Sequence, residues 1–146
     1  MVRGIVRIMP VIHSAFFHTS EASMSNQILL VEDSRTQALR IQLELARYGL
    51  KLMIASDGIS GLEAARTHRP DVVVLDIDLP DLDGYAVCHA IKSDPTLEHI
   101  PIIMLTQRDA ARDALTGLQV GAVDYIPKDS FAEINLVEAL RQLGVL

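Results

Sequence analysis

The sequence predicts an α/β fold in which a parallel sheet of five strands is covered on both faces by five helices. From Asn26 onward, short apolar runs of strand length alternate with longer segments of helical periodicity. Two of the runs, Val72–Leu75 and Ile100–Leu105, are continuously apolar, as burial on both faces of a sheet requires. Strands that alternate with helices in this way are typical of parallel sheets.

Each predicted strand is an apolar run that ends at polar or turn-forming residues. The five runs are Gln27–Val31, Lys51–Ala55, Val72–Leu75, Ile100–Leu105 and Ala122–Ile126. Pro101 falls near the start of the fourth run, where the missing amide hydrogen costs least.

Each predicted helix has an apolar stripe or a clear stop signal. Ser34 can cap the first helix, and Gly49 ends it. The first helix has the stripe Ala38, Ile41, Leu45 and Tyr48, and the second has the stripe Ile59, Leu62 and Ala65 and ends before Arg69 and Pro70. The third runs from Gly84 to Ser93 and ends before Asp94 and Pro95, and the fourth runs from Ala110 to Val120 and ends before Gly121. The fifth runs from Phe131 to Leu143 with the stripe Ile134, Val137, Leu140 and Leu143.

Length and composition indicate one globular domain. A chain of 146 residues can form a single good core, and 49% apolar with 22% charged residues is an ordinary globular balance. The net charge of -6 argues against a broad surface for nucleic acid or for an anionic membrane. The single cysteine, Cys88, excludes an internal disulfide and a cysteine-based metal site, and we expect it in the core.

The first 24 residues differ from the rest of the chain. Their apolar stretch is interrupted by Pro10 and His13, is too short to span a membrane, and only loosely resembles a signal peptide. We expect residues 1–24 to be a disordered leader, or a non-native extension ahead of a natural start at Met24. The folded domain is expected over residues 25–146, with no second domain.

Acidic residues end two of the predicted strands. Asp76 closes the third strand, and Glu32 and Asp33 close the first. If these strands are neighbours, the carboxylates meet at the edge of the sheet where ligands of parallel folds bind. Two carboxylates about 4 Å apart repel by roughly 4 kcal/mol at an effective dielectric constant near 20, so three of them need a cation or a proton. Oxygen ligands favour Mg²⁺, whereas the ordinary alternative is that these acids are separate caps and loop residues.

Two further strand ends carry groups that suit phosphoryl chemistry. Thr106 places a hydroxyl after the fourth strand, and Lys128 places an ammonium after the fifth. Each residue taken alone is more ordinary as a helix cap or as a solvated loop residue. Together with the acids they supply what an aspartyl phosphate requires.

In this order and at these separations, the motifs resemble the receiver domain of response regulators in two-component signalling. The similarity covers about Asn26 to Leu146 and lies in Leu30-Val31-Glu32-Asp33-Ser34, in Leu75-Asp76-Ile77-Asp78-Leu79-Pro80-Asp81-Leu82-Asp83-Gly84, in Leu105-Thr106 and in Tyr125-Ile126-Pro127-Lys128. The resemblance implies a flavodoxin-like, doubly wound five-stranded parallel sheet of order 2-1-3-4-5 with five helices.

The resemblance also implies a role for each site residue. Asp76 would accept a phosphoryl group from a phosphohistidine on a sensor histidine kinase or a histidine phosphotransfer protein. Lys128 and Thr106 would contact that group, and Tyr125 would be the aromatic switch residue. The magnesium ligands would be Glu32, Asp33, Asp76 and the backbone carbonyl of Asp78.

A stand-alone cytoplasmic switch is the function that these roles imply. Its partners would be the phosphohistidine donor and a downstream protein target, with neither nucleic acid nor membrane. The surface of the fourth helix, fifth strand and fifth helix would bind the target, and a phosphorylation-dependent homodimer is left open. Such a protein is not a general enzyme, because it catalyses only its own phosphorylation and dephosphorylation.

The sequence departs from the usual family pattern in four places. Glu32 stands where aspartate is also common, and Asp78 adds a carboxylate two residues after the acceptor. Gln107 replaces a small residue, and Asp129 replaces a frequent proline, so a trans peptide bond is expected after Lys128. Asp81 and Asp83 are interpreted as turn formers ahead of Gly84.

Two other functions compete with the receiver hypothesis. Asp76 and Asp78 also resemble the nucleophile and acid/base pair of haloacid-dehalogenase-like phosphatases, although that motif belongs on the first strand of a larger domain. A degenerate receiver that serves only as an interaction module is the second alternative. The complete set of Glu32, Asp33, Asp76, Thr106 and Lys128 argues against it.

Overall fold

A computed structural model describes residues 6–9, 26–107, 115–116 and 119–146. Strands and helices alternate along the chain, as the periodicity predicts. The strands are β1 (Val6–Met9), β2 (Gln27–Val31), β3 (Lys51–Ala55), β4 (Val72–Asp76), β5 (Ile102–Thr106) and β6 (Asp124–Pro127), and the helices are α2 (Arg35–Ala46), α3 (Gly58–His68), α4 (Gly84–Lys92) and α6 (Ala132–Gln142).

The predicted sheet is confirmed. Its strands lie in the order β1-β3-β2-β4-β5-β6, and every neighbouring pair from β3 to β6 is parallel. Counted from the first parallel strand, this is the order 2-1-3-4-5. The first and third parallel strands, β2 and β4, are therefore direct neighbours, with Val31 opposite Leu75.

The structure corrects the number of helices and the extent of two stripes. Four helices are present in the described part of the chain, where five were predicted. The predicted helix from Ala110 to Val120 lies mostly outside the described residues, although its described positions are helical. Tyr48 and Ile134 are 39% and 63% exposed, because α2 ends at Ala46 and because α6 turns other residues toward the sheet.

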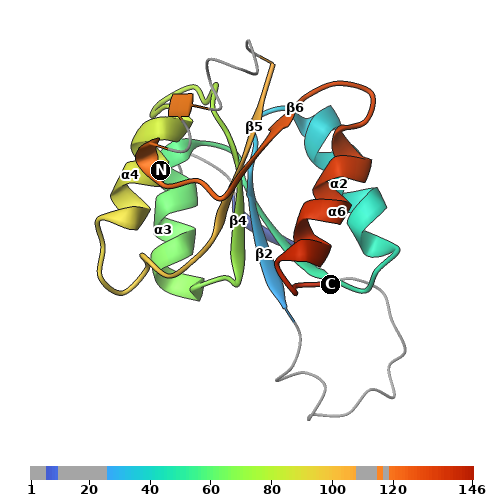
Figure 1. Cartoon of the computed structure of the whole chain (residues 1–146), viewed down its shortest axis with the longest axis horizontal. Helices are drawn as coiled ribbons and strands as arrows, with labels where there is room; N and C mark the ends of the chain where they lie inside the picture. The colour runs from blue at the N-terminus through green and yellow to red at the C-terminus, as the bar shows by residue number, and fades with distance from the viewer. Residues whose placement is uncertain (1–5, 10–25, 108–114, 117–118) are drawn as a thin grey trace.

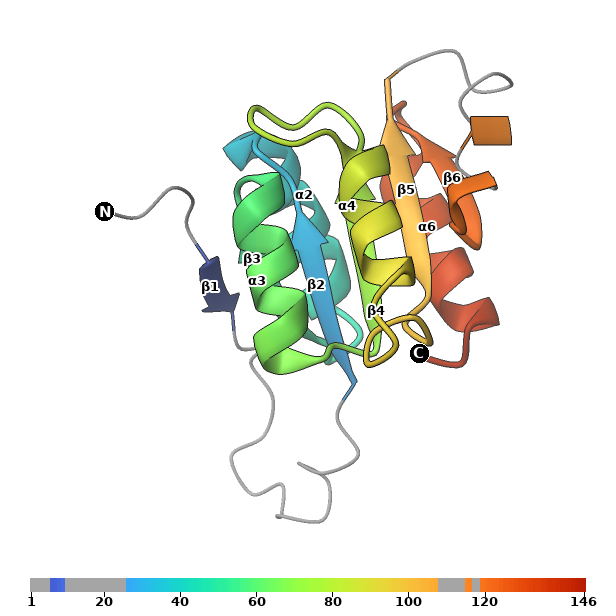
Figure 2. The ribbon, with the colours of Figure 1, turned by 90° about the vertical axis from the view of Figure 1, so that its left-hand side faces the viewer.

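Helices α2 and α6 cover one face of the sheet, and α3 and α4 cover the other (Figure 1). The core under α2 and α6 includes Ile41, Leu45, Leu136 and Leu140, which pack on the alternate strand residues Leu30 and Val74. The core under α3 and α4 contains Ala65, Val87, Cys88 and Ile91 against Leu29 and Leu75. In Figure 2 the second pair of helices lies in front of the sheet. Cys88 is fully buried, as expected.

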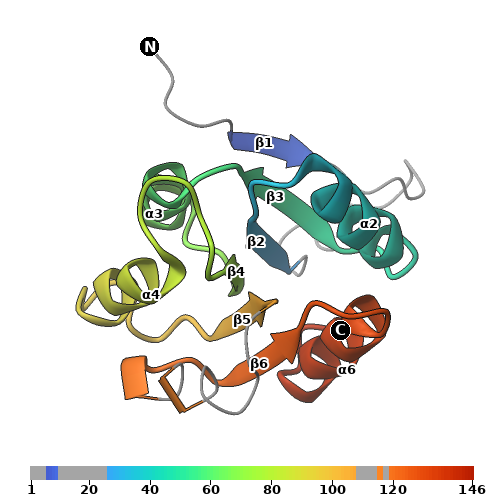
Figure 3. The same cartoon turned by 90° about the horizontal axis from the view of Figure 1, so that it is seen from above.

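A sixth strand, β1, lies at the edge of the sheet beside β3 (Figure 3). It pairs antiparallel with β3, Val6 opposite Ala55 and Met9 opposite Leu52. Sequence reasoning placed these four residues in a leader without regular structure, and at these residues that expectation differs from the structure. An edge strand presents unpaired amide and carbonyl groups that another extended segment can bind, which a local pattern does not reveal. The domain boundary at residue 25 stays a prediction.

None of the described helices has the length and the apolar character that are needed to cross a membrane.

Candidate functional site

The candidate site lies at the carboxyl edge of the parallel strands. Asp76 is the last residue of β4, and Glu32 and Asp33 directly follow β2. Because β2 and β4 are neighbours in register, the three side chains converge: one carboxylate oxygen from each lies within 4.8 Å of the others. Glu32 and Asp76 are buried, whereas Asp33 is exposed. The cluster therefore has a buried base and one side that is open to solvent.

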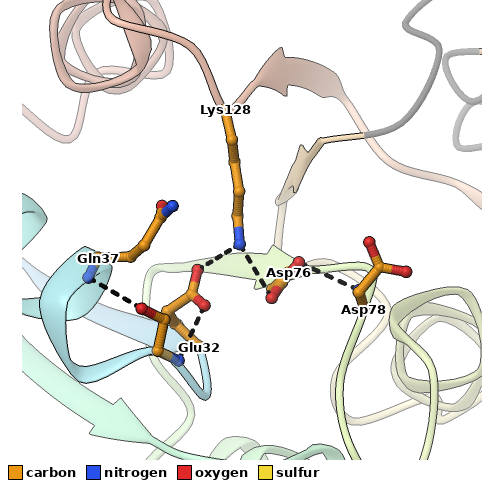
Figure 4. Close-up of polar contacts among 6 residues, drawn as sticks. Glu32, Gln37, Asp76, Asp78 and Lys128 are labelled. Carbon is orange, nitrogen blue, oxygen red and sulfur yellow. Dashed lines mark hydrogen bonds and ion pairs between the residues drawn. The ribbon is translucent and has the colours of Figure 1, made fainter.

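Lys128, directly after β6, joins the cluster at the same carboxyl edge of the sheet. Its Nζ lies 2.8 Å from Glu32 Oε1 and 3.0 Å from Asp76 Oδ2, and its side chain is only 7% exposed. Figure 4 shows the lysine side chain reaching between the two carboxylates. Three carboxylates with one ammonium leave two net negative charges when all four groups are ionised.

The charges at the site alter the pKa values of two buried groups. Burial is the main reason that the pKa of Glu32 is raised to about 7; Lys128 opposes this rise, and the nearby Asp76 adds to it. Burial alone would lower the pKa of Lys128, but the hydrogen bond and charge of Glu32, followed by those of Asp76, raise it above its ordinary value. Lys128 therefore stays protonated at neutral pH, whereas the pKa of Glu32 lies close to neutral pH.

Backbone amides fix the orientation of the acidic side chains. Asp78 N–H donates to Asp76 Oδ1 (3.1 Å), so that one oxygen of Asp76 contacts an amide and the other contacts Lys128. Ser34 N–H donates to Glu32 Oε2 (3.1 Å). The Ser34 hydroxyl accepts from Gln37 N–H (3.2 Å), as the predicted cap of α2 requires (Figure 4).

Two other predicted site residues lie on β5, which is next to β4, and on β6, which is one strand further along the sheet. Thr106 is fully buried at the end of β5, and its carbonyl accepts the amide of Lys128 (2.7 Å). Tyr125 is half-buried on β6, opposite Met104, and packs against the core cluster under α3 and α4. The carboxylate of Asp78 lies on the far side of Asp76 from Glu32 (Figure 4). None of the described peptide bonds is cis, which confirms the trans bond expected after Lys128.

Sequence reasoning missed the roles of two aspartates in the loop between β4 and α4. Asp83 is the N-cap of α4 and accepts the amide of Ala86 (2.9 Å). The carboxylate of Asp81 makes contacts outside its own loop, where it accepts the first two amides of α3, those of Gly58 (2.7 Å) and Ile59 (3.0 Å). The cap was detectable, since an aspartate precedes a helix start, but the contact to α3 joins residues more than twenty positions apart.

A second feature that the sequence did not reveal is the tight fit of Gly84. A Cβ atom on Gly84 would overlap the carbonyl oxygen of Asp76 and would lie 2.7 Å from Ile77 Cα. The amide of Gly84 donates to the carbonyl of Ile77 (2.8 Å). Glycine at this position lets the loop after Asp76 fold back directly on the strand end.

Comparisons with known proteins agree on one family. The family model of the response regulator receiver domain matches residues 28–141. Response regulator MprA of Mycobacterium ulcerans is 39% identical over 120 residues, which are 82% of this chain and 50% of that protein. The chain thus spans about half the length of this curated relative.

Solved structures give the same result. The receiver domain of a signal transduction histidine kinase from Syntrophus aciditrophicus is 34% identical, with a TM-score of 0.74 over 82% of this chain and 89% of that one. The receiver domain of sensor histidine kinase PA1611 from Pseudomonas aeruginosa, with a magnesium ion coordinated in its active site cleft, is 32% identical. Its TM-score is 0.74, and the match covers 82% of this chain and 98% of that one.

Proposed function

Because this chain belongs to the response regulator receiver domain family, we propose that Asp76 is its phosphoacceptor. The donor is a phosphohistidine of a sensor histidine kinase or of a histidine phosphotransfer protein. The observation that carries the proposal is the position of Asp76: a buried carboxylate at a strand end, held by an amide on one oxygen and by Lys128 on the other. A carboxylate fixed in this way is oriented for attack on phosphorus.

In the transfer, an oxygen of Asp76 attacks the phosphorus atom, the bond from phosphorus to the imidazole nitrogen breaks, and its electron pair stays on the imidazole. Lys128 is placed to pair with the new phosphoryl oxygens, because its Nζ is 3.0 Å from Asp76 Oδ2 and its raised pKa keeps it charged. The exposed side of the site, at Asp33, leaves an approach for the donor.

The donor set of the site suits a divalent cation, and we propose Mg²⁺. Glu32, Asp33 and Asp76 offer only oxygen ligands and bring the site to two net negative charges with Lys128. We also assign the backbone carbonyl of Asp78 to the metal shell. When bound, Mg²⁺ supplies positive charge that neutralises the phosphoryl oxygens during transfer. The magnesium-bound receiver of PA1611 supports this choice by similarity.

The switch that follows phosphorylation is proposed to run through β5 and β6. The backbone of Thr106 already binds the amide of Lys128, so a shift at the phosphoryl group can move both strand ends together. Tyr125, three residues before Lys128 on β6, is half-buried and can change its packing in response. The target surface would comprise the segment at Ala110–Val120, β6 and α6. A downstream protein partner, a phosphorylation-dependent homodimer and a cytoplasmic location stay predictions.

Phosphoryl stoichiometry tests the proposal. In Mg²⁺, the protein should take up one phosphoryl group per chain from acetyl phosphate and should not turn over small phosphate esters many times. The comparisons do not favour the haloacid-dehalogenase-like phosphatase, for which multiple turnover through Asp76 and Asp78 would be the result. No uptake, with no binding of Mg²⁺ or beryllofluoride by calorimetry, would instead support the interaction-only module.

A further inference from the structure

The loop between β4 and α4 is tied to the start of α3 by one carboxylate. Asp81 Oδ1 accepts the amide of Gly58 (2.7 Å), and Oδ2 accepts the amide of Ile59 (3.0 Å). These are the first two amides of α3, which have no partner within the helix. The local N-cap, Asp57, binds a different amide, that of Ser60 (2.7 Å). The two aspartates thus accept different amides at the start of α3, and only Asp81 belongs to the loop between β4 and α4.

Close packing accompanies this contact. A Cβ atom on Gly58 would lie 2.6 Å from the carbonyl oxygen of Leu82 and 2.9 Å from Leu82 Cβ. The loop therefore lies directly on the backbone of the first helical turn, at a residue with no side chain. Burial raises the pKa of Asp81, but the amide hydrogen bonds, chiefly those of Ile59 and Gly58, together outweigh it and hold this pKa below its usual value. Asp81 is ionised at neutral pH, when its contact is strongest.

The other end of the same loop contacts the proposed phosphoacceptor. Asp78 N–H donates to Asp76 Oδ1 (3.1 Å), and the amides of Leu79 and Gly84 both donate to the carbonyl of Ile77 (3.1 and 2.8 Å). Gly84 lies against the backbone of Asp76 and Ile77 with no room for a side chain. The loop is therefore held at two places, the start of α3 and the backbone beside Asp76, and Asp78 lies between them.

We propose that Asp81 is a positioning residue for phosphorylation: by binding the two amides of α3 it fixes the loop that presents the Asp78 amide to Asp76. The inference rests on the proposed function of Asp76 as phosphoacceptor. On this proposal, the orientation of the Asp76 carboxylate depends on the contact between Asp81 and α3, a helix outside the acidic cluster. Asp81 itself touches none of the reacting atoms.

The test compares D81A with D57A, which removes the other carboxylate that caps the same helix, the acceptor of the Ser60 amide. Phosphoryl uptake from acetyl phosphate is measured in saturating Mg²⁺ at several donor concentrations. D81A should lower the maximum rate by roughly tenfold, less than the roughly hundredfold loss of a 1 Å displacement, while the half-saturating donor concentration stays within about twofold. D57A should keep the wild-type rate. D81N, which retains one acceptor oxygen, should fall between wild type and D81A.

Hydrogen exchange in the metal-free proteins gives a readout that does not depend on activity. The amide of Asp78 should exchange faster in D81A than in wild type and at the wild-type rate in D57A. The inference would be overturned if D81A had the wild-type phosphorylation rate and the wild-type exchange rate at Asp78. It would also be overturned if D57A slowed phosphorylation as much as D81A does. If the wild-type protein takes up no phosphoryl group, the proposed function fails. The Asp78 exchange rates then still decide whether Asp81 orders the loop.

Discussion

The ammonium of Lys128 lies 3.0 Å from the carboxylate of Asp76, and both side chains are almost completely buried. Lys128 also contacts Glu32, at 2.8 Å, so that one cation serves two buried anions. Removing one partner of a buried ion pair leaves an uncompensated charge in a medium that solvates it poorly. Most of the expected behaviour of the site follows from this shared cation.

Replacement of Lys128 by methionine should destabilise the metal-free protein at pH 8. The variant leaves Glu32 and Asp76 facing each other without a cation, which costs about 3 kcal/mol of unfolding free energy. Urea unfolding in a chelator measures the loss, and adding Mg²⁺ should recover much of it. The control R141M loses one charge from the exposed pair with Glu138, and its stability should change by less than about 0.5 kcal/mol. Equal losses in the two variants would contradict the shared-cation account.

Glu32 should make the stability of the metal-free protein depend on pH. Its pKa is about 7 in the folded protein and 4.5 in the reference state, so the folded protein binds this proton more tightly than the unfolded chain. Unfolding then releases a proton between these values, and stability falls as the pH rises from about 4.5 to about 7. Well above pH 7 the loss of unfolding free energy due to Glu32 reaches its full value of about 3 kcal/mol.

The variant E32Q isolates this effect, since it cannot titrate. Unfolding free energies of wild type and E32Q are compared from pH 4.5 to pH 8 in a chelator. Relative to E32Q, wild type should lose stability as the pH rises, because only wild type carries the titrating group. A difference that is independent of pH, or that changes in the opposite direction, would show that folding does not raise the pKa of Glu32.

Asp33 should be needed for metal binding and not for folding. Its side chain is exposed, so D33N should change the metal-free unfolding free energy by no more than about 0.5 kcal/mol. Mg²⁺ at saturating concentration should raise the melting temperature of wild type and have little effect on D33N, because a ligand stabilises only the state that binds it. E138Q, which removes one exposed carboxylate from α6, should keep the wild-type response. An unchanged Mg²⁺ response in D33N would remove Asp33 from the site.

Gly84→Ala should disturb both stability and phosphorylation. The added Cβ would overlap the Asp76 carbonyl and lie 2.7 Å from Ile77 Cα, which forces the strand end or the loop to move. We expect a loss of about 1 to 3 kcal/mol in urea unfolding, together with a lower uptake rate. Gly49→Ala is the control, because its Cβ would meet nothing within 4 Å and only the positive φ of 72° is unfavourable. A fully active G84A would show that the loop can take another conformation.

The sequence was sufficient to predict the parallel sheet and the meeting of Glu32, Asp33 and Asp76. Both depend on local signals: apolar runs mark the strands, and acidic residues directly follow two of them. Parallel strands place their carboxyl ends at one edge, so the side chains converge once β2 and β4 are neighbours. The direct contact of Lys128 with both Glu32 and Asp76 is a detail that only coordinates provide.

The features that escaped prediction depend on contacts between distant segments. Asp81 was interpreted as a turn former, because nothing in its neighbours indicates that its carboxylate binds the start of α3. Strand β1 was missed because its partner is the edge of a sheet formed elsewhere in the chain. Ile134 fitted a helical stripe by spacing, but it is exposed, and Leu136 is buried with the predicted residues Val137 and Leu140. In each case the competing local pattern was plausible and the tertiary contact decided.

The most direct test of the central claim is to locate the phosphoryl group. The protein is treated briefly with a phosphohistidine donor in Mg²⁺, the acyl phosphate is trapped by borohydride reduction, and the modified peptide is sequenced by mass spectrometry. The account predicts modification at Asp76 alone and none in D76N, with D78N still modified. Modification at another residue, or an equal yield in D76N, would contradict it.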